Sequence, residues 1–176
     1  MTPKNKEDGH RAKRAGRESE KRLTIACENM GYKRHHLIKD FKIRGGNLNH
    51  SYYGTVKFDK PEKFFLAEKK SDNYFQSDGL IVNPANDKGA IIESKNSDKR
   101  GTTEEKCFYD LYKIEEGIYG SEYPLVYLFQ GSVCEKVNEY ALFAAEAEKR
   151  KLPVHVIFDP TPDLRTFQSF MKKLLG

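Results

Sequence analysis

The sequence lacks any apolar run of the roughly 18–20 residues that a membrane-spanning helix needs. Its N-terminus is basic but has no apolar stretch of the kind found in secretory signals. Cysteine is scarce: Cys27, Cys107 and Cys134 form no CxxC pair and have no zinc-ligand spacing. These absences argue against a membrane protein and a zinc module. We therefore expect a cytoplasmic protein in which Cys27 and Cys107, on apolar faces of predicted helices, are buried reduced thiols.

The 176 residues suit one domain with a core and a short tail, and the 38% hydrophobic and 32% charged content fits a globular protein. The net charge of +5 is unevenly placed, because residues 4–22 hold eight Lys or Arg and only four acids. We expect residues 1–15 to be a basic disordered arm and residues 16–176 to be a single domain. The arm suits a phosphate backbone, and the alternative is a solvated tail.

Apolar spacing predicts a first helix from Arg17 to Met30 that ends at Gly31. Strands are predicted over 52–58, 64–68, 78–82, 90–95, 123–129 and 152–158, with a tight turn over 86–89. A helix begins at Thr102 or Thr103 and runs to about Glu116. This order predicts an α/β protein with a mixed central sheet and helices on both faces.

Two helices are predicted near the C-terminus. The first covers 132–150, and one face is expected to hold Val133, Val137, Ala141 and Ala144 or Ala145. The second is capped by Asp163 and ends near Leu175. Its inward face is expected to hold Leu164, Phe167, Phe170, Met171 and Leu174.

The strand over 90–95 carries two charges in an apolar setting. Side chains two apart on a strand share a face, so Glu93 and Lys95 point the same way. The strand before it pairs through a short turn and can bring Asp78 beside Glu93. Buried charges persist when they are paired or bound to metal, and a hard divalent cation relieves the repulsion between two carboxylates. The alternatives are a surface ion pair for Glu93 and Lys95, and a turn-opening role with Gly79 for Asp78.

These residues resemble the PD-(D/E)XK nuclease superfamily. The motif is Ser77-Asp78, a short hairpin, and then Glu93-Ser94-Lys95, with Ser77 in place of the usual proline. The element order resembles the αβββαβ core of that family. The segment Gly16 to Glu20 looks like its first helix, and Gly101 to Lys106 resembles the loop and helix start of many restriction-type endonucleases.

The resemblance implies a site in which Asp78, Glu93 and Lys95 are catalytic. Asp78, Glu93 and the backbone carbonyl of Ser94 would bind Mg²⁺, or Mn²⁺ in its place. Lys95 would contact the scissile phosphate and the attacking water, and it is left open whether it also acts as a base. Glu20 would be a further catalytic residue, either as a second ligand of the metal or by orienting a metal-bound water, with a solvated helix charge as the alternative.

Contacts to DNA are expected from two regions. The segment 33–75, with Lys42, Arg44, Asn47 and Asn49, combines basic and amide side chains that suit phosphates and base edges, although an ordinary surface loop is the alternative. The second set is Lys99, Arg100 and Lys106, which are either DNA contacts or solvent-facing charges. Gln130 ends the buried strand over 123–129 and either faces the site or is an ordinary polar residue at a strand end.

The leading interpretation is a Mg²⁺-dependent endodeoxyribonuclease that cuts double-stranded DNA as a homodimer, in the manner of a type II restriction endonuclease. A Holliday-junction resolvase, another structure-specific nuclease or a homing endonuclease is the alternative among enzymes. A non-catalytic DNA-binding module on the same fold is the alternative of another class. Intact Asp78, Glu93 and Lys95 argue against the module, because clustered carboxylates do not help to hold phosphates.

Overall fold

The computed structural model describes seven ranges of the chain: 17–35, 43–44, 57–58, 64–67, 78–96, 102–116 and 123–176. The predicted N-terminal arm, most of the predicted strand over 52–58 and most of segment 33–75 lie outside these ranges. Within them, no helix combines the length and apolarity needed to cross a membrane.

A mixed six-stranded sheet in the order β1-β4-β5-β6-β7-β8 forms the centre of the described fold. Its strands are β1 (Lys33–His35), β4 (Phe64–Ala67), β5 (Gly79–Asn83), β6 (Lys88–Lys95), β7 (Leu125–Gln130) and β8 (Val154–Asp159). β4, β5 and β6 pair antiparallel, whereas β6, β7 and β8 run parallel, as does β1 beside β4. A separate antiparallel pair joins β2 (Ile43–Arg44) to β3 (Lys57–Phe58).

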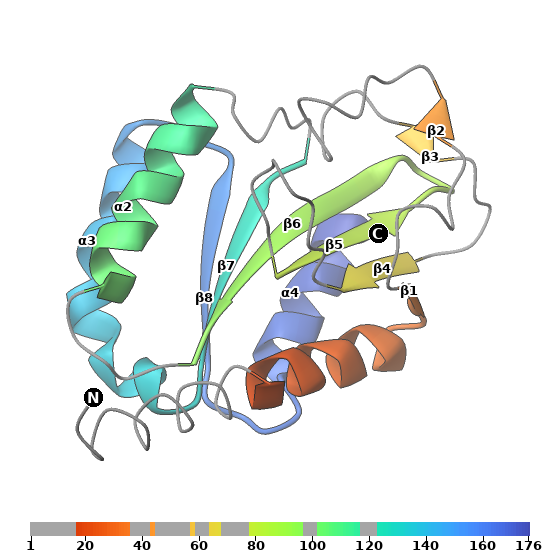
Figure 1. Cartoon of the computed structure of the whole chain (residues 1–176), viewed down its shortest axis with the longest axis horizontal. Coiled ribbons are helices and arrows are strands. Elements are labelled where there is room, and N and C mark those ends of the chain that lie inside the picture. Colours follow the sequence, from red (N-terminus) through yellow and green to blue (C-terminus); the bar gives the residue numbers. More distant parts are fainter. Residues whose placement is uncertain are drawn as a thin grey trace, which may run out of the picture.

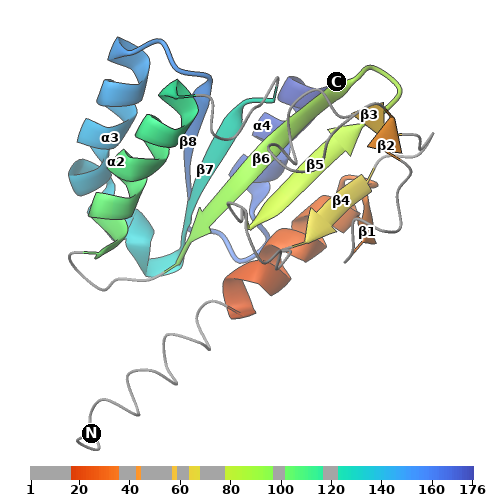
Figure 2. The same ribbon diagram turned by 45° about the horizontal axis from the view of Figure 1, so that its top comes forward.

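Helices cover both faces of this sheet. α2 (Thr102–Glu115) and α3 (Val137–Lys149) lie on one side, and α4 (Arg165–Leu175) lies on the other with the N-terminal helix, residues 17–29 (Figures 1 and 2). The N-terminal helix ends where predicted, at a turn in which Gly31 adopts a positive φ of 86°. The predicted α/β class, with a mixed sheet between helices, is confirmed.

Each face of the sheet packs into its own apolar cluster, because successive strand side chains point to opposite faces. Ile91 of β6 joins α2 and α3, whereas Ala90 and Ile92 join the N-terminal helix and α4. Cys107 and Cys27 are buried in these two clusters as free thiols, as predicted. The two clusters fix which face of β6 each of its later residues presents.

The β5–β6 hairpin is tighter than the sequence suggested. The turn occupies 84–87, and β6 begins at Lys88, two residues before the predicted start. Asp87 supplies the left-handed residue of the turn, with φ of 57°, and Asn86 Oδ1 accepts the Lys88 N–H at 3.1 Å. Gly89 serves packing instead, since a Cβ there would lie 2.9 Å from the Tyr123 ring.

The predicted helix over 132–150 is two elements, and its predicted face is only partly right: Val133 is buried, but the predicted alanines of α3 do not form the inward face. A 3-10 turn, η2 (Gly131–Lys136), precedes α3 and shifts its phase. Tyr140, Phe143 and Ala147 are buried, while Ala141 and Ala145 are exposed. Aromatic side chains bury far more apolar area than alanines, so they take the inward positions.

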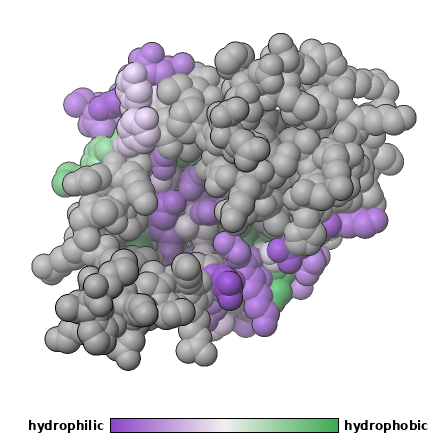
Figure 3. All heavy atoms as spheres, viewed as in Figure 1, coloured by the Kyte–Doolittle hydropathy of each residue, from purple (hydrophilic) through white to green (hydrophobic). Residues whose placement is uncertain are grey.

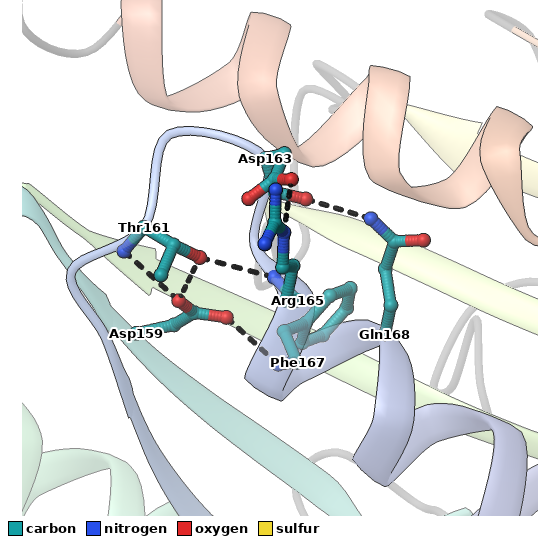
Figure 4. A network of polar contacts seen from close by, with 6 residues as sticks. All are labelled: Asp159, Thr161, Asp163, Arg165, Phe167 and Gln168. Carbon is teal, nitrogen blue, oxygen red and sulfur yellow. Dashed lines mark hydrogen bonds and ion pairs between the residues drawn. The ribbon is translucent and has the colours of Figure 1, made fainter.

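The predicted Asp163 cap of α4 is also wrong. Leu164 is the N-cap, with φ of 54° and no side-chain cap, and Asp163 instead pairs with Arg165 at 2.6 Å. Asp159, at the end of β8, accepts the Phe167 N–H at 2.8 Å and the Thr161 N–H at 3.0 Å (Figure 4). Asp159 therefore joins the sheet to the start of α4. The predicted inward face of α4 is largely confirmed, because Leu164, Phe167 and Met171 are buried.

We expect Asp159→Ala to lower the free energy of unfolding by about 2 kcal/mol, because it leaves buried N–H donors unpaired. Urea denaturation would measure this. Asp163→Ala is the control, and its free energy of unfolding should match that of the wild type within error because Asp163 and Arg165 are solvent-facing. An equal decrease in the free energy of unfolding in the two variants would show that Asp159 does not stabilise the start of α4.

Candidate active site

Glu93 and Lys95 project from β6 towards α2, on the face that Ile91 shares. Lys95 Nζ lies 3.0 Å from Glu93 Oε2, and the two side chains are only 21% and 7% exposed. The pair is largely buried, so the alternative of a surface ion pair does not hold. In the space-filling view, hydrophilic residues gather between α2 and the strands of the sheet (Figure 3).

Asp78 enters the same site from the other arm of the hairpin. Gly79 pairs with Ile92, so Asp78 stands opposite Glu93. Its Oδ2 accepts the backbone N–H of Ser94 at 2.6 Å, a charge-assisted bond. Asp78 therefore binds the residue between Glu93 and Lys95, and its role goes beyond opening a turn with Gly79.

α2 and β7 add two residues that the sequence reasoning missed. Asp110 is 5% exposed and accepts a short hydrogen bond from Tyr127 Oη. The Tyr127 ring centroid lies 5.5 Å from Lys95 Nζ, within range of a cation–π contact. A signal for Asp110 was present in the sequence: it lies three residues after Cys107 and one before Leu111, on the buried stripe of α2.

The site places one ammonium group among three acids in a poorly hydrated region. The pKa of Glu93 is raised to about 7, first by burial and then by the charges of Asp78 and Asp110, while Lys95 acts to lower it. Burial likewise raises the pKa of Asp78, against the lowering effects of Lys95 and the Ser94 N–H. The excess of negative charge favours the uptake of a proton or a cation.

The lysine experiences the opposite balance. Burial lowers the pKa of Lys95, but the surrounding charges of Glu93 and Asp78 outweigh that effect and hold the pKa above its ordinary value. Cys107 beside them is a neutral thiol, because burial raises its pKa to about 11. Lys95 is thus the site's positive charge, and thiolate chemistry is not supported.

Ser94 points to the other face of β6, towards the N-terminal helix. Its Oγ lies 2.8 Å from Ser19 Oγ and accepts a hydrogen bond from Gln130 Nε2 at 2.6 Å. Glu20 follows Ser19 and is exposed on this helix, which covers the face opposite Glu93 and Lys95. The structure therefore brings Asp78, Glu93, Ser94 and Lys95 together and places Glu20 on the helix behind them.

The predicted DNA contacts stay predictions. Lys42, Asn47, Asn49, Lys99 and Arg100 lie outside the described residues. The backbone of β2 includes Arg44 and that of α2 includes Lys106, but both side chains fall outside the described part of the chain.

The oxygen atoms of the site are of the kind that a hard metal ion prefers. Among the described residues, no group of three or more His, Cys, Asp or Glu side chains is arranged to hold one. Asp78 and Glu93 nevertheless supply two carboxylates, and neither Asp78 Oδ1 nor Glu93 Oε1 has a hydrogen-bond partner among those residues. Mg²⁺ is commonly held by one or two carboxylates and keeps several waters, so this oxygen set fits Mg²⁺.

We expect the metal-free protein to lose stability as the pH rises from 5 to 8, because the raised pKa of Glu93 means that the folded state binds a proton the unfolded state has released. The contribution is about 2 kcal/mol over this window. Urea denaturation in EDTA should show that Glu93→Gln removes it.

Glu146→Gln on α3 is the control, because the pKa of Glu146 is lowered. Its titration therefore changes the stability only at a pH below this window. The same pH dependence in Glu93→Gln as in the wild type would contradict the assignment.

No protein-family model matches the chain, and no curated protein or solved structure matches it either. The chemistry of the site therefore rests on the geometry of its own residues.

Proposed function

We propose that this chain is a magnesium-dependent endonuclease that hydrolyses phosphodiester bonds of double-stranded DNA. The observation that carries this proposal is the group of Asp78, Glu93 and Lys95. Asp78 lies directly before β5 and is bonded to the backbone of β6 between the other two, and Glu93 is buried. The resemblance to PD-(D/E)XK nucleases and the net charge of +5 support it.

Each residue of the group has a role that its surroundings favour. Asp78 and Glu93, with the backbone carbonyl of Ser94, would hold Mg²⁺, or Mn²⁺ in its place. The bound ion supplies Lewis-acid relief of the negative charge that develops on the phosphate. Lys95, kept positive by the surrounding acids, contacts the scissile phosphate and orients the attacking water.

Two residues support Lys95. The Tyr127 ring lies against its ammonium group, and Asp110 accepts the hydrogen bond of the Tyr127 hydroxyl. Burial raises the pKa of Tyr127 well above its usual range, so this hydroxyl keeps its proton and remains a donor. Tyr127, itself held by Asp110, would keep Lys95 in place when Glu93 binds the metal ion.

We propose a site-specific, type II-like enzyme that acts as a homodimer, because one site cuts one strand and two-fold symmetry supplies the second cut. Phe167 and Met171 of α4 are buried in the core, so they are not available to a dimer interface. We therefore place the interface on the other side of the sheet. There, Leu142 of α3 is 71% exposed, and Phe108 and Tyr112 of α2 are 44% and 48% exposed.

Incubation with supercoiled plasmid tests the activity. We expect cleavage with Mg²⁺ or Mn²⁺ and inhibition by Ca²⁺, which fits the same oxygens with looser geometry. Asp78→Ala, Glu93→Ala and Lys95→Ala should each lower the rate by at least about 100-fold, whereas Glu20→Ala should have a smaller effect or none.

Glu146→Gln is the control and should cut at the wild-type rate. Full activity after exhaustive EDTA treatment, or near wild-type cutting by any of the three alanine variants, would contradict the assignment. Discrete ends in the sequenced products would support site specificity, whereas cutting of four-way junctions alone would show a resolvase.

Light scattering with and without duplex DNA tests the assembly. We expect a dimer at least on DNA, and Leu142→Asp should weaken it because a charge replaces an apolar contact. Ser169→Asp, at an exposed position of α4, is the matched control and should leave the dimer intact. A monomer in both conditions that only nicks DNA would refute the homodimer.

A further inference from the structure

A polar cluster lies behind the proposed site, between the sheet and the N-terminal helix. It consists of Ser19, Ser94 and Gln130, and we call it the serine–glutamine cluster. Ser19 is 5% exposed and Gln130 is fully buried. The surrounding layer is apolar, with Ile92 and Leu128 as neighbours along the same strands. Polar groups in such a layer are costly unless they are hydrogen-bonded.

The hydrogen bonds of this cluster join Ser19, Ser94 and Gln130 to one another. Gln130 Nε2 donates to Ser94 Oγ at 2.6 Å and to Ser19 Oγ at 2.9 Å, and the two serine oxygens lie 2.8 Å apart. Gln130 Oε1 is buried and has no hydrogen-bond partner among the described residues. The amide thus holds two hydroxyl groups while its own oxygen stays unpaired, an arrangement that an apolar side chain would avoid. The unpaired oxygen costs stability, whereas the two donated hydrogen bonds fix the positions of both hydroxyl groups.

Ser94 is the residue on which the proposed site depends. It lies between Glu93 and Lys95, and its N–H holds Asp78 Oδ2 at 2.6 Å. A displacement of its backbone would move the donor that fixes Asp78 and would also change the directions of the two charged side chains. Ser19 and Gln130 hold the Ser94 hydroxyl on the face of the sheet opposite Glu93 and Lys95. They can therefore fix the strand without occupying the site.

We infer that Gln130 and Ser19 are positioning residues that act through Ser94 to hold Asp78 and Glu93 in a geometry that binds a divalent cation. The inference rests on the proposed function for the role of the ion. It also assigns a task to the N-terminal helix, because Ser19 connects that helix to the strand that carries the site.

The test compares Gln130→Met, Ser94→Ala and their double variant with the wild type. Met keeps the approximate length of Gln but has no donor, and Ala at position 94 removes only the hydroxyl. Asn83→Leu is the control, since Asn83 is a buried amide on neighbouring β5 that donates to the Leu175 carbonyl at 3.3 Å, away from the cluster.

Two readouts are measured for each variant: the rise in melting temperature as MgCl₂ is added, and the Mg²⁺ concentration that gives half-maximal plasmid cleavage. Both single variants should need about 10- to 100-fold more Mg²⁺ by either readout. The double variant should be no worse than the more affected single variant, because both changes break the same contact. Asn83→Leu should melt lower than the wild type but keep its Mg²⁺ dependence.

The outcomes separate this inference from the nuclease proposal. An unchanged Mg²⁺ dependence in folded Gln130→Met or in Ser94→Ala overturns the inference while wild-type cleavage upholds the nuclease. A wild type that binds Mg²⁺ without cutting DNA, with weaker binding in the variants, upholds the inference and refutes the nuclease. A wild type whose melting temperature does not respond to Mg²⁺, and which does not cut, overturns both.

Discussion

The buried pair of Glu93 and Lys95 is the interaction around which the candidate site is built. Two charged side chains on the buried face of an apolar sheet need partners, because an isolated buried charge is far less stable than a paired one. The hairpin brings Asp78 against the intervening backbone, and α2 brings Asp110 to the hydroxyl of Tyr127 beside the lysine. One ammonium group then lies among three acids. This imbalance lowers the stability of the site and favours the uptake of a proton or a cation.

The alternation of a β-strand allows one short segment to serve both faces of the sheet. Glu93 and Lys95 face α2, whereas Ser94 faces the N-terminal helix and is held there by Ser19 and Gln130. Parallel pairing of β6 with β7 sets Glu93 beside Tyr127, and Gln130 follows at the end of β7. The proposed site is therefore held by polar contacts on the face of the N-terminal helix and by aromatic and acidic side chains on the face of α2. Both supports come from elements distant in sequence.

Local patterns predicted the elements better than their boundaries and inward faces. The buried strands and the four helices lie close to their predicted positions because their apolar spacing is strong. The inward face of α3 was mispredicted because a 3-10 turn shifted its phase and because Tyr140 and Phe143 fill the core better than alanines do. The start of α4 was mispredicted because its N–H partner, Asp159, belongs to the preceding strand and not to the helix.

The sequence by itself determined the α/β class, the hairpin and the shared face of Glu93 and Lys95, because a strand's two-residue period and a short turn are local properties. Tertiary structure alone decided that these charges are buried, that Asp110 and Tyr127 stand beside them, and that Gln130 and Ser19 hold Ser94. Those contacts join residues up to 111 positions apart. Their physical cause is the packing of helices onto both faces of the sheet, which no local pattern encodes.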